Sequence, residues 1–574
     1  MSRWHIFFNA VVFPRVFSGY NKQMTRRDSI VVIGAGVGGL VCATILAKAG
    51  FGVSLIEQNN KVGGLSQGWE RKIRLANGER VRATFDLTHL MSQFLPGEHF
   101  YELYTSLGVD WETVGAFIPT SKIACLRAPS GEFFEILNGF EESRAQLKQL
   151  YPRESVNIDR YFQLLDNIDE QFQAPPHRRP GWQRTLETLL APGCEKYLPL
   201  NAMLSLLTKP HFVKWHKHTQ QQLVDAFFKD DQLKTHLSLI ADYMGLPPSR
   251  ASGLMMCLVV LSFWKHGGPS VPKRSSYQTL HNELARVLVE KHGGTVHLGT
   301  KAIDITVEKN RVKGVSIQAY RRGTELRFLV ASTVVVAGDM KKILLPLADR
   351  LPKKYVQKLS RMKMATSFLT VHMVVERDKL PLNDSHGVYG TTMVVSSPSA
   401  LEIEQSKEFP KKYNIIVSFP GLVRPQAPHV STLDGQPLNK YLRMDLSMKC
   451  PSYEKLAILR QSDKPAYKAL KEKTVMQMID IVEAHFLPGL KDALQYKLSF
   501  TAATMERYCS VTQGAVYGFE QTPNQFPPYR MSPWTPIKGL YATGAGTLAG
   551  GIAGVIAAGE RTANIVIRER GRGM

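Results

Sequence analysis

A glycine-rich turn near the start of the sequence has the spacing of a dinucleotide-binding site. Residues 34–39 read Gly-Ala-Gly-Val-Gly-Gly and fit the pattern GxGxxG. In this pattern Gly34 permits a tight turn, Gly36 lets the backbone approach a pyrophosphate, and Gly39 lets a helix pack close to a strand. Glu57 follows roughly 20 residues further on, where an acid binds the ribose hydroxyls. Because an acid disfavours a 2′-phosphate, the pattern predicts FAD or NAD as the dinucleotide.

A second glycine-rich turn lies towards the other end of the sequence. Residues 540–559 read LYATGAGTLAGGIAGVIAAG, which predicts a short strand ending at Gly544, a glycine-rich turn and a helix. The free N–H groups and the dipole at such a helix start stabilise negative charge on a reduced flavin. The sequence shows no Ser-His-Asp set, paired carboxylates, CxxC pair or metal-ligand spacing, so we expect no metal site. This favours flavin chemistry, in which the cofactor accepts hydride and the protein orients the substrate.

The glycine pair Gly63-Gly64, a short loop after Glu57, resembles the second glycine patch of the two-dinucleotide-binding-domain flavoproteins. That group includes amine oxidases, carotenoid desaturases and Rab GDP-dissociation inhibitors. An Arg often follows the glycines there, and Leu65 stands here instead, which argues against amine oxidases. Residues 365–372 (ATSFLTVH) and 504–518 (TMERYCSVTQGAVYG) are similar to segments of carotenoid isomerases and retinol saturases. The chain therefore resembles the phytoene desaturase, carotenoid isomerase and retinol saturase family of FAD-dependent oxidoreductases.

The resemblance implies FAD as the cofactor and implies roles for individual residues. A hairpin at 301–315 would cover the adenine, Gly544 would lie near the ribityl chain, and a helix opened by Gly551 and Gly554 would face the isoalloxazine. The implied cofactor-binding residues are Gly34, Gly36, Gly39, Glu57, Gly63, Gly64, Ile303, Gly544, Gly551, Ile552 and Gly554. The candidate catalytic residues are His89, His372, Arg507 and Tyr508, each with a structural role as the alternative. His89 follows Phe85-Asp86, a pair that resembles the start of the family's FDxG stretch.

The elements that must position these residues predict an α/β fold. A strand at 29–33, a helix at 37–49 and a strand at 53–56 have the size of one βαβ unit. Further buried strands are expected at 332–337 and 368–375, and mostly helix is expected from 110 to 265.

These elements predict a Rossmann-like FAD-binding domain built from three chain segments, with an α+β substrate domain inserted. We assign 28–110, 266–345 and 500–574 to the first, and 111–265 and 346–499 to the second, which would also associate with membranes. Residues 1–27 form an N-terminal extension: a membrane-surface segment, a targeting peptide or a stretch before a start at Met24.

The chain carries a formal net charge of +23, which favours an anionic partner. Basic residues mix with aromatic and apolar ones at 198–228 and with Leu at 341–363. Because no groove-reading or base-stacking element accompanies them, we expect an anionic membrane surface rather than nucleic acid. No run reaches the roughly 18 apolar residues of a spanning helix. We therefore expect a cytoplasmic protein held peripherally at a membrane, with organellar targeting as the alternative and the oligomeric state open.

Together these features predict an FAD-dependent oxidoreductase that desaturates, saturates or isomerises a long apolar polyene, with the helix at 251–264 as one wall of its tunnel. Only one GxGxxG is present, so NAD(P)H has no Rossmann site of its own. Electrons are then expected to pass between FAD and oxygen, a quinone or a transiently bound reductant. The alternatives are an amine oxidase-like flavoenzyme and a non-catalytic prenyl- or lipid-binding protein of the Rab GDP-dissociation inhibitor type.

Overall fold

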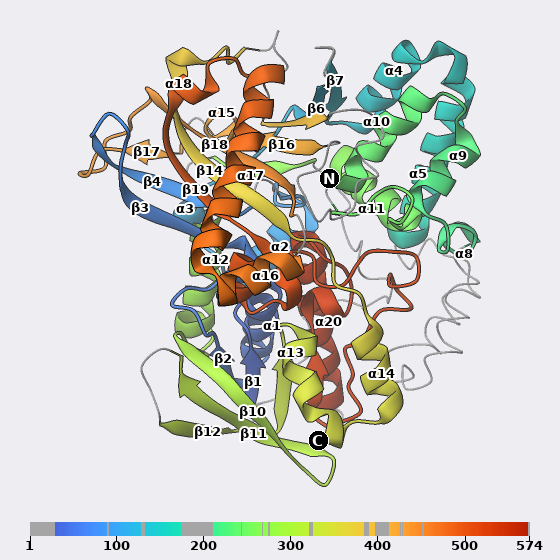
Figure 1. Cartoon of the computed structure of the whole chain (residues 1–574). Coiled ribbons are helices and arrows are strands. Elements are labelled where there is room, and N and C mark those ends of the chain that lie inside the picture. The colour runs from blue at the N-terminus through green and yellow to red at the C-terminus, as the bar shows by residue number, and fades with distance from the viewer. Residues whose placement is uncertain are drawn as a thin grey trace.

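The computed structural model describes residues 29–571 except 89–90, 128–132, 174–209, 243, 267, 274–275, 321–324, 384–387, 389, 396–412, 425, 428 and 451–452. The predicted extension at 1–27 and the candidate His89 therefore lie outside the described residues. Two sheets organise the molecule: a five-stranded parallel sheet in the lower half of Figure 1, and a seven-stranded mixed sheet in the upper half.

The lower sheet has the Rossmann-like arrangement that the sequence predicts. Its parallel strands run in the order β20 (Leu540–Ala542), β13 (Thr333–Val336), β1 (Ser29–Ile33), β2 (Gly52–Ile56) and β9 (Thr295–His297). One face is covered by α1 (Val37–Lys48), α12 (Tyr277–Arg286) and α20 (Ile552–Gly571). The other is covered by the antiparallel sheet of β10 (Thr300–Glu308), β11 (Arg311–Ala319) and β12 (Leu326–Val330). Because both of their faces are buried, the central strands β1 and β13 consist mainly of Val and Ile. Three chain segments supply this sheet, which confirms the predicted fold class.

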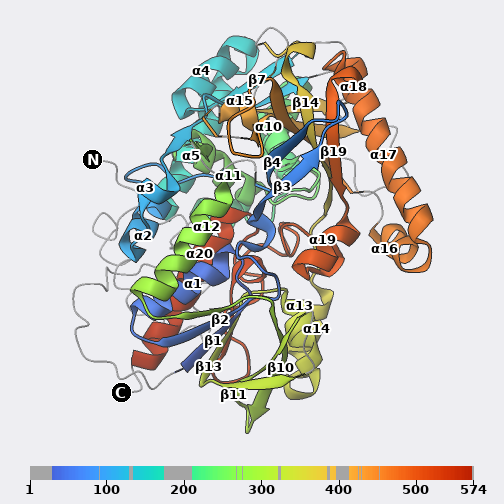
Figure 2. The same ribbon diagram turned by 90° about the vertical axis from the view of Figure 1, so that its left-hand side faces the viewer.

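The upper sheet has the order β19 (Leu494–Phe500), β14 (Phe368–Glu376), β18 (Tyr441–Lys449), β16 (Asn414–Ser418), β15 (Thr391–Val395), β6 (Lys122–Arg127) and β7 (Phe133–Leu137). Neighbours are antiparallel except β15 and β6. The long helix α17 (Lys464–His485), at the right of Figure 2, packs along its outer face through Val475, Met478 and Ile479. The prediction of mostly helix from 110 to 265 was wrong at 122–137, because the buried run Ile123–Leu126 pairs with the distant strand β15.

A helical lobe at the upper right of Figure 1 contacts the second sheet. It contains α4 (Phe140–Leu150), α5 (Ser155–Gln173), α8 (Pro210–Trp215), α9 (Gln220–Phe227), α10 (Asp231–Asp242) and α11 (Gly253–Trp264). In α11 every residue except Val259 is buried, so this apolar segment is a core helix. Among the described residues, no helix is both long and apolar enough to cross a membrane.

Shorter elements connect these layers. They are β3 (Gly68–Arg74), β4 (Arg80–Asp86), α2 (His99–Leu107), α3 (Trp111–Val114), β5 (Phe117–Pro119), β8 (Ser270–Pro272), α13 (Met340–Leu344), α14 (Lys353–Arg361), α15 (Pro420–Val423), β17 (Val430–Ser431), α16 (Tyr453–Ser462), α18 (Leu490–Ala493) and α19 (Ala502–Cys509).

The segment that contains α14 packs on the nucleotide-binding side of the molecule. Leu347, Leu351, Leu359 and Met362 join the cluster formed by β1, β13 and the β10–β12 sheet. From the sequence, residues 346–499 are predicted to belong to the substrate domain. We propose instead that this domain begins after about residue 364, because the amphipathic helix α14 buries its one apolar stripe against the Rossmann-like core.

Glu98 precedes α2 and is a buried carboxyl whose charge should cost stability. Burial raises its pKa from 4.5 to about 7, against one hydrogen bond from the Leu95 N–H. A raised folded-state pKa gives stability that is full below about pH 4.5 and lost as the pH rises through 7. Glu98→Gln should therefore raise the free energy of unfolding at pH 8 by up to about 3 kcal/mol and have little effect at pH 5.

Urea denaturation at the two pH values measures this difference. The control is Glu112→Gln, which changes an exposed carboxylate on α3 and should leave the unfolding free energy nearly unchanged at both. An equal effect of Glu98→Gln at pH 5 and pH 8 would rule out the protonation account.

Candidate active site

A cavity of about 500 Å³ is bordered by residues of both large sheets. One end, the glycine end, is formed by turns of the parallel sheet and includes Gly34, Gly36, Glu57, Gly63, Gly64, Gly544, Gly551, Ile552 and Gly554. The other, the sheet end, is formed by α11 and the inner face of the upper sheet. It includes Met255, Leu258, Val259, Phe263, Phe368, Thr370, Thr391, Ile416, Ser418, Ser447 and Phe500. Helix α11 is thus a wall of the cavity, as predicted.

The first glycine turn is closed where protein packs and open where a ligand would approach. A Cβ on Gly39 would lie 2.0 Å from the Gly34 carbonyl oxygen, so only glycine lets α1 start this close to β1. A Cβ on Gly36 would meet nothing within 4 Å. The second patch lies against this turn, because the Gly63 N–H donates to the Ala35 carbonyl at 2.8 Å. The open side of Gly36 is the approach that a pyrophosphate needs.

Glu57 holds the shape of the same turn. One carboxylate oxygen accepts from the Ala35 N–H and the other from the Asn59 N–H, both at 2.9 Å. Burial raises the pKa of Glu57, and these backbone hydrogen bonds oppose the rise. The carboxylate borders the cavity and has lone pairs left over, so it can accept ribose hydroxyls as predicted.

The second glycine turn brings a helix N-terminus to the cavity. Gly544 and Gly551 have φ of +80° and +81°, values that favour glycine, and a Cβ on Gly551 would again meet nothing within 4 Å. α20 begins at the next residue and points its free N–H groups at this space. The buried Arg530 braces the turn by donating to the Ala545 carbonyl at 2.6 Å. Open space beside both helix starts is what a bound dinucleotide requires, so the residues present fit FAD.

Three of the other predicted site residues do not border the cavity. Ile303 lies on β10 with 46% of its surface exposed and does not border the cavity. Arg507 and Tyr508 are exposed at the end of α19 and do not border it either, whereas the next residue, Cys509, does. The Tyr508 carbonyl accepts from Asn59 at 3.0 Å, so this segment packs over the turn that follows Glu57.

His372 is fully buried behind the cavity wall. Its ring is enclosed by Trp69, Phe85 and Phe500 at centroid distances of 5.3, 5.6 and 5.6 Å. Its Nδ1 lies 2.7 Å from an Asp445 oxygen, and its Nε2 has no hydrogen-bond partner among the described residues. The arrangement makes His372 part of a polar network, and a catalytic role for it stays a prediction.

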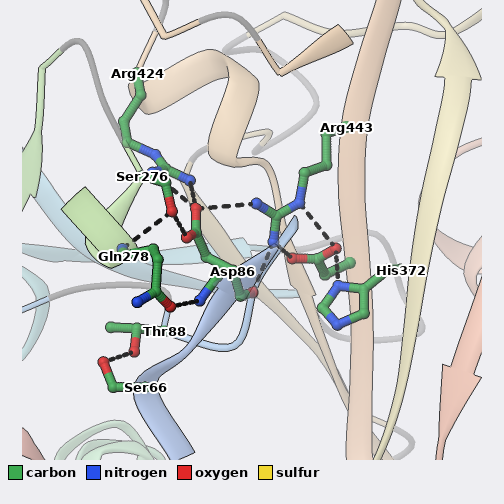
Figure 3. Close-up of polar contacts among 10 residues, drawn as sticks. Ser66, Asp86, Thr88, Ser276, Gln278, His372, Arg424 and Arg443 are labelled. Atoms are coloured by element: carbon green, nitrogen blue, oxygen red, sulfur yellow. Dashed lines mark hydrogen bonds and ion pairs between the residues drawn. The ribbon is translucent and has the colours of Figure 1, made fainter. Parts of the chain in front are cut away.

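That network is a buried set of ion pairs that sequence reasoning missed (Figure 3). Asp86 lies at its centre, and Arg424 and Arg443 approach it from opposite sides. The Asp86 Oδ2 is 3.1 Å from both terminal nitrogens of Arg424 and 3.4 Å from Nη1 of Arg443. Arg443 also donates to Asp445 at 2.6 Å. Burial alone would raise the pKa of Asp86, but the two guanidinium charges hold it below its ordinary value.

The network ties the β3–β4 hairpin to the upper sheet and so fixes the back of the cavity. Asp86 ends β4, Arg443 and Asp445 belong to β18, and Arg424 follows α15. The partners lie more than 300 residues apart along the chain. No local sequence pattern predicts ion pairs between residues so far apart. Only Phe85-Asp86 stood out in the sequence, as a resemblance to the family's FDxG stretch.

Comparison with known proteins agrees with this site. The family model described as flavin containing amine oxidoreductase matches residues 37–433. The chain belongs to this family. It is accordingly an FAD-dependent oxidoreductase, as its sequence predicted.

Curated relatives are similar along nearly the whole chain. All-trans-retinol 13,14-reductase from Danio rerio is 22% identical over 560 residues, covering 94% of this chain and 86% of that protein. Phytoene desaturase (lycopene-forming) from Pseudescherichia vulneris is 24% identical over 551 residues, covering 94% and 99%. 4,4'-diapolycopene oxygenase from Methylomonas sp is 26% identical over 353 residues, covering 61% and 63%.

Solved structures share the fold at lower identity. An oxidoreductase from Methanosarcina mazei superposes with a TM-score of 0.57 at 14% identity, covering 93% of this chain and all of that one. Putrescine oxidase superposes with a TM-score of 0.53 at 15% identity, covering 94% and 99%. These likenesses establish the α/β flavoprotein fold.

Proposed function

We propose that this flavoprotein acts on carbon–carbon bonds of a long apolar polyene. The observation that carries the proposal is the chemistry of the cavity wall. The charged residues among its described lining are Glu57 and Asp339, and both lie in turns that follow strands of the parallel sheet. The sheet end is lined by apolar and hydroxyl side chains. Such a wall suits an uncharged hydrocarbon chain, because burying an unpaired charge there would be costly.

The names of the relatives support the same substrate class. Retinol and phytoene are both polyenes, and the relatives named for them each align with 94% of this chain. The family also contains enzymes for amines, but the described sheet end offers no carboxylate to pair with an ammonium group. We therefore rank amine oxidation second. The intact glycine turns argue against a non-catalytic lipid-binding protein.

When bound, FAD supplies the hydride-accepting and hydride-donating chemistry. The chain's own residues bind and orient the two reactants. Gly36 and Glu57 would hold the dinucleotide, and the N–H groups at the start of α20 would stabilise negative charge on it. α11 and the inner face of the upper sheet confine the polyene and exclude water. Oxygen or a quinone is the proposed electron partner.

We further propose that the substrate comes from an anionic membrane surface. α14 and the residues after it expose Lys353, Lys354, Arg361 and Lys363, and the segment 353–363 contains no acid. At 198–228, the other predicted surface, residues 198–209 lie outside the described residues. Basic side chains of this kind attract anionic headgroups, and salt weakens the attraction.

One experiment tests both proposals. The purified protein is mixed anaerobically with a polyene in anionic liposomes while its visible flavin spectrum is recorded. Bleaching of the oxidised flavin would indicate desaturation, and reoxidation of the prereduced flavin would indicate saturation. The rate should fall steeply as salt is raised, and neutral liposomes are the control. A flavin that responds to a polar amine and to no polyene would overturn the proposal.

A further inference from the structure

A row of polar side chains crosses the inner face of the upper sheet. His372 on β14 is paired with Asp445 on β18, Asp445 with Ser418 on β16, and Ser418 with Thr391 on β15. Directly opposed residues in antiparallel strands point to the same face of a sheet. The four side chains therefore form one continuous line on the face that borders the cavity.

The two halves of this row have different environments. His372 and Asp445 carry the ionisable groups; both are buried and neither borders the cavity, and the His372 ring is enclosed by Trp69, Phe85 and Phe500. Ser418 and Thr391 both border the cavity. The row thus presents its neutral half to the cavity, and its ionisable half does not reach the cavity.

The hydroxyls of Ser418 and Thr391 are available to a ligand. Neither makes a hydrogen bond with another described residue, although both residues are more than nine-tenths buried. The adjacent hydroxyls of Thr370 and Ser447 also border the cavity, but they lie 3.0 Å apart and bond to each other. Buried hydroxyls normally find a partner, and in this cavity the partner has to come from a ligand or a water.

We propose that Ser418 and Thr391 form a subsite for a neutral oxygen function, such as a hydroxyl, at the end of an otherwise apolar substrate. This inference rests on the proposed polyene function and narrows it to oxygenated polyenes. A hydroxyl both donates and accepts, so it can pair with two serine or threonine hydroxyls. A carboxylate would find no cation among the described residues of this part of the wall and would lose its hydration without compensation.

The subsite would also determine which carbon–carbon bond of the substrate reacts. The residues of the sheet end belong to α11 and the upper sheet of Figure 1, and those of the glycine end to turns of the lower sheet. Anchoring one end of a polyene at Ser418 and Thr391 sets which of its bonds lies at the cofactor. A hydrocarbon without the oxygen could slide, so it would bind more weakly and react at more than one position.

The test compares matched ligands on the flavin-loaded protein, using quenching of protein fluorescence to measure binding. All-trans-retinol should bind about tenfold more tightly than its methyl ether, which cannot donate, because the site would be left with an unpaired hydroxyl. Retinoic acid, the matching carboxylate, should bind more weakly than either. Equal affinity for retinol and its ether, or tighter binding of the acid, would overturn the subsite and leave the polyene proposal standing.

Variants test whether Ser418 and Thr391 cause the preference for retinol over its methyl ether. The Ser418→Ala, Thr391→Val double variant should bring the ratio of the two affinities close to one, mainly by weakening the alcohol. The control Ser499→Ala removes a hydroxyl from the same sheet on the opposite face, next to the cavity residue Phe500, and should keep the tenfold ratio. An unchanged ratio in the double variant overturns the assignment to these residues. If no polyene binds the wild-type protein, both the subsite and the proposed function fall.

Discussion

Replacing Gly36 with valine is expected to give a folded protein that no longer holds FAD. Gly36 has φ of −63° and ψ of 168°, a conformation that any residue adopts, so the substitution places no strain on the backbone. Its Cβ would meet no protein atom, and it would fill the space through which the pyrophosphate approaches. We expect affinity for FAD to fall by on the order of 100-fold, or about 2.8 kcal/mol.

The flavin absorbance per mole of purified protein measures this loss, and far-ultraviolet circular dichroism checks the fold. Gly52→Val is the matched control, because Gly52 also has open space around its Cβ but lies exposed at the start of β2, away from the cavity. It should keep full flavin content. A Gly36→Val protein that retains its flavin would refute the placement of the pyrophosphate at this turn.

Removing the charge of Asp86 should destabilise the protein by about 3–5 kcal/mol, since it leaves two guanidinium groups buried with too little negative charge. Asp86, Arg424 and Arg443 are all at most 1% exposed, so water cannot compensate. Asp86→Asn keeps the shape of the side chain and isolates the effect of charge. Denaturation by urea, followed through the flavin or through tryptophan fluorescence, measures the change.

A second substitution separates charge balance from packing. Adding Arg424→Met to Asp86→Asn removes one positive charge as well, so the double variant should lose clearly less than the sum of the two single losses. Glu70→Gln is the control: it breaks the ion pair between Glu70 and Arg82 on the same hairpin, where side chains are exposed by 50% and 35%, and should cost less than about 1 kcal/mol. Strictly additive losses would show that the network is not coupled.

The parts of the molecule that were predictable from sequence are those with short-range signals. The turn at 34–39 and Glu57 lie within one βαβ unit, so spacing alone placed them on the same site, and the strands at 29–33 and 333–336 were found as uninterrupted apolar runs. The apolar run at 251–264 was predicted to form a wall of the substrate tunnel, and α11 does border the cavity, because a helix that is apolar on all sides has to lie inside the molecule.

The missed features depend on contacts between distant parts of the chain. β6 is a short strand that pairs on one side with β15, far along the sequence, and β7 is the short edge strand that pairs with β6, so local periodicity did not reveal them. Arg424, Arg443 and Asp86 look like ordinary surface charges until the fold brings them together. Arg507 and Tyr508 were placed near the flavin by resemblance, yet the end of α19 turns them outward and leaves Cys509 at the cavity.

The division of the flavin site among three segments has a consequence for the order in which the protein matures. β20 and α20, at residues 540–571, supply the second glycine turn, and Gly559 of α20 packs so closely on Gly38 of α1 that a Cβ would lie 2.4 Å from its carbonyl oxygen. During synthesis the βαβ unit at 29–56 emerges first and must wait, with that face of α1 uncovered, until nearly the whole chain has been made. A nascent or prematurely ended chain would display the nucleotide-binding signature and still be unable to load FAD. We therefore expect FAD to bind only after α20 has been synthesised, because the second glycine turn belongs to that last segment.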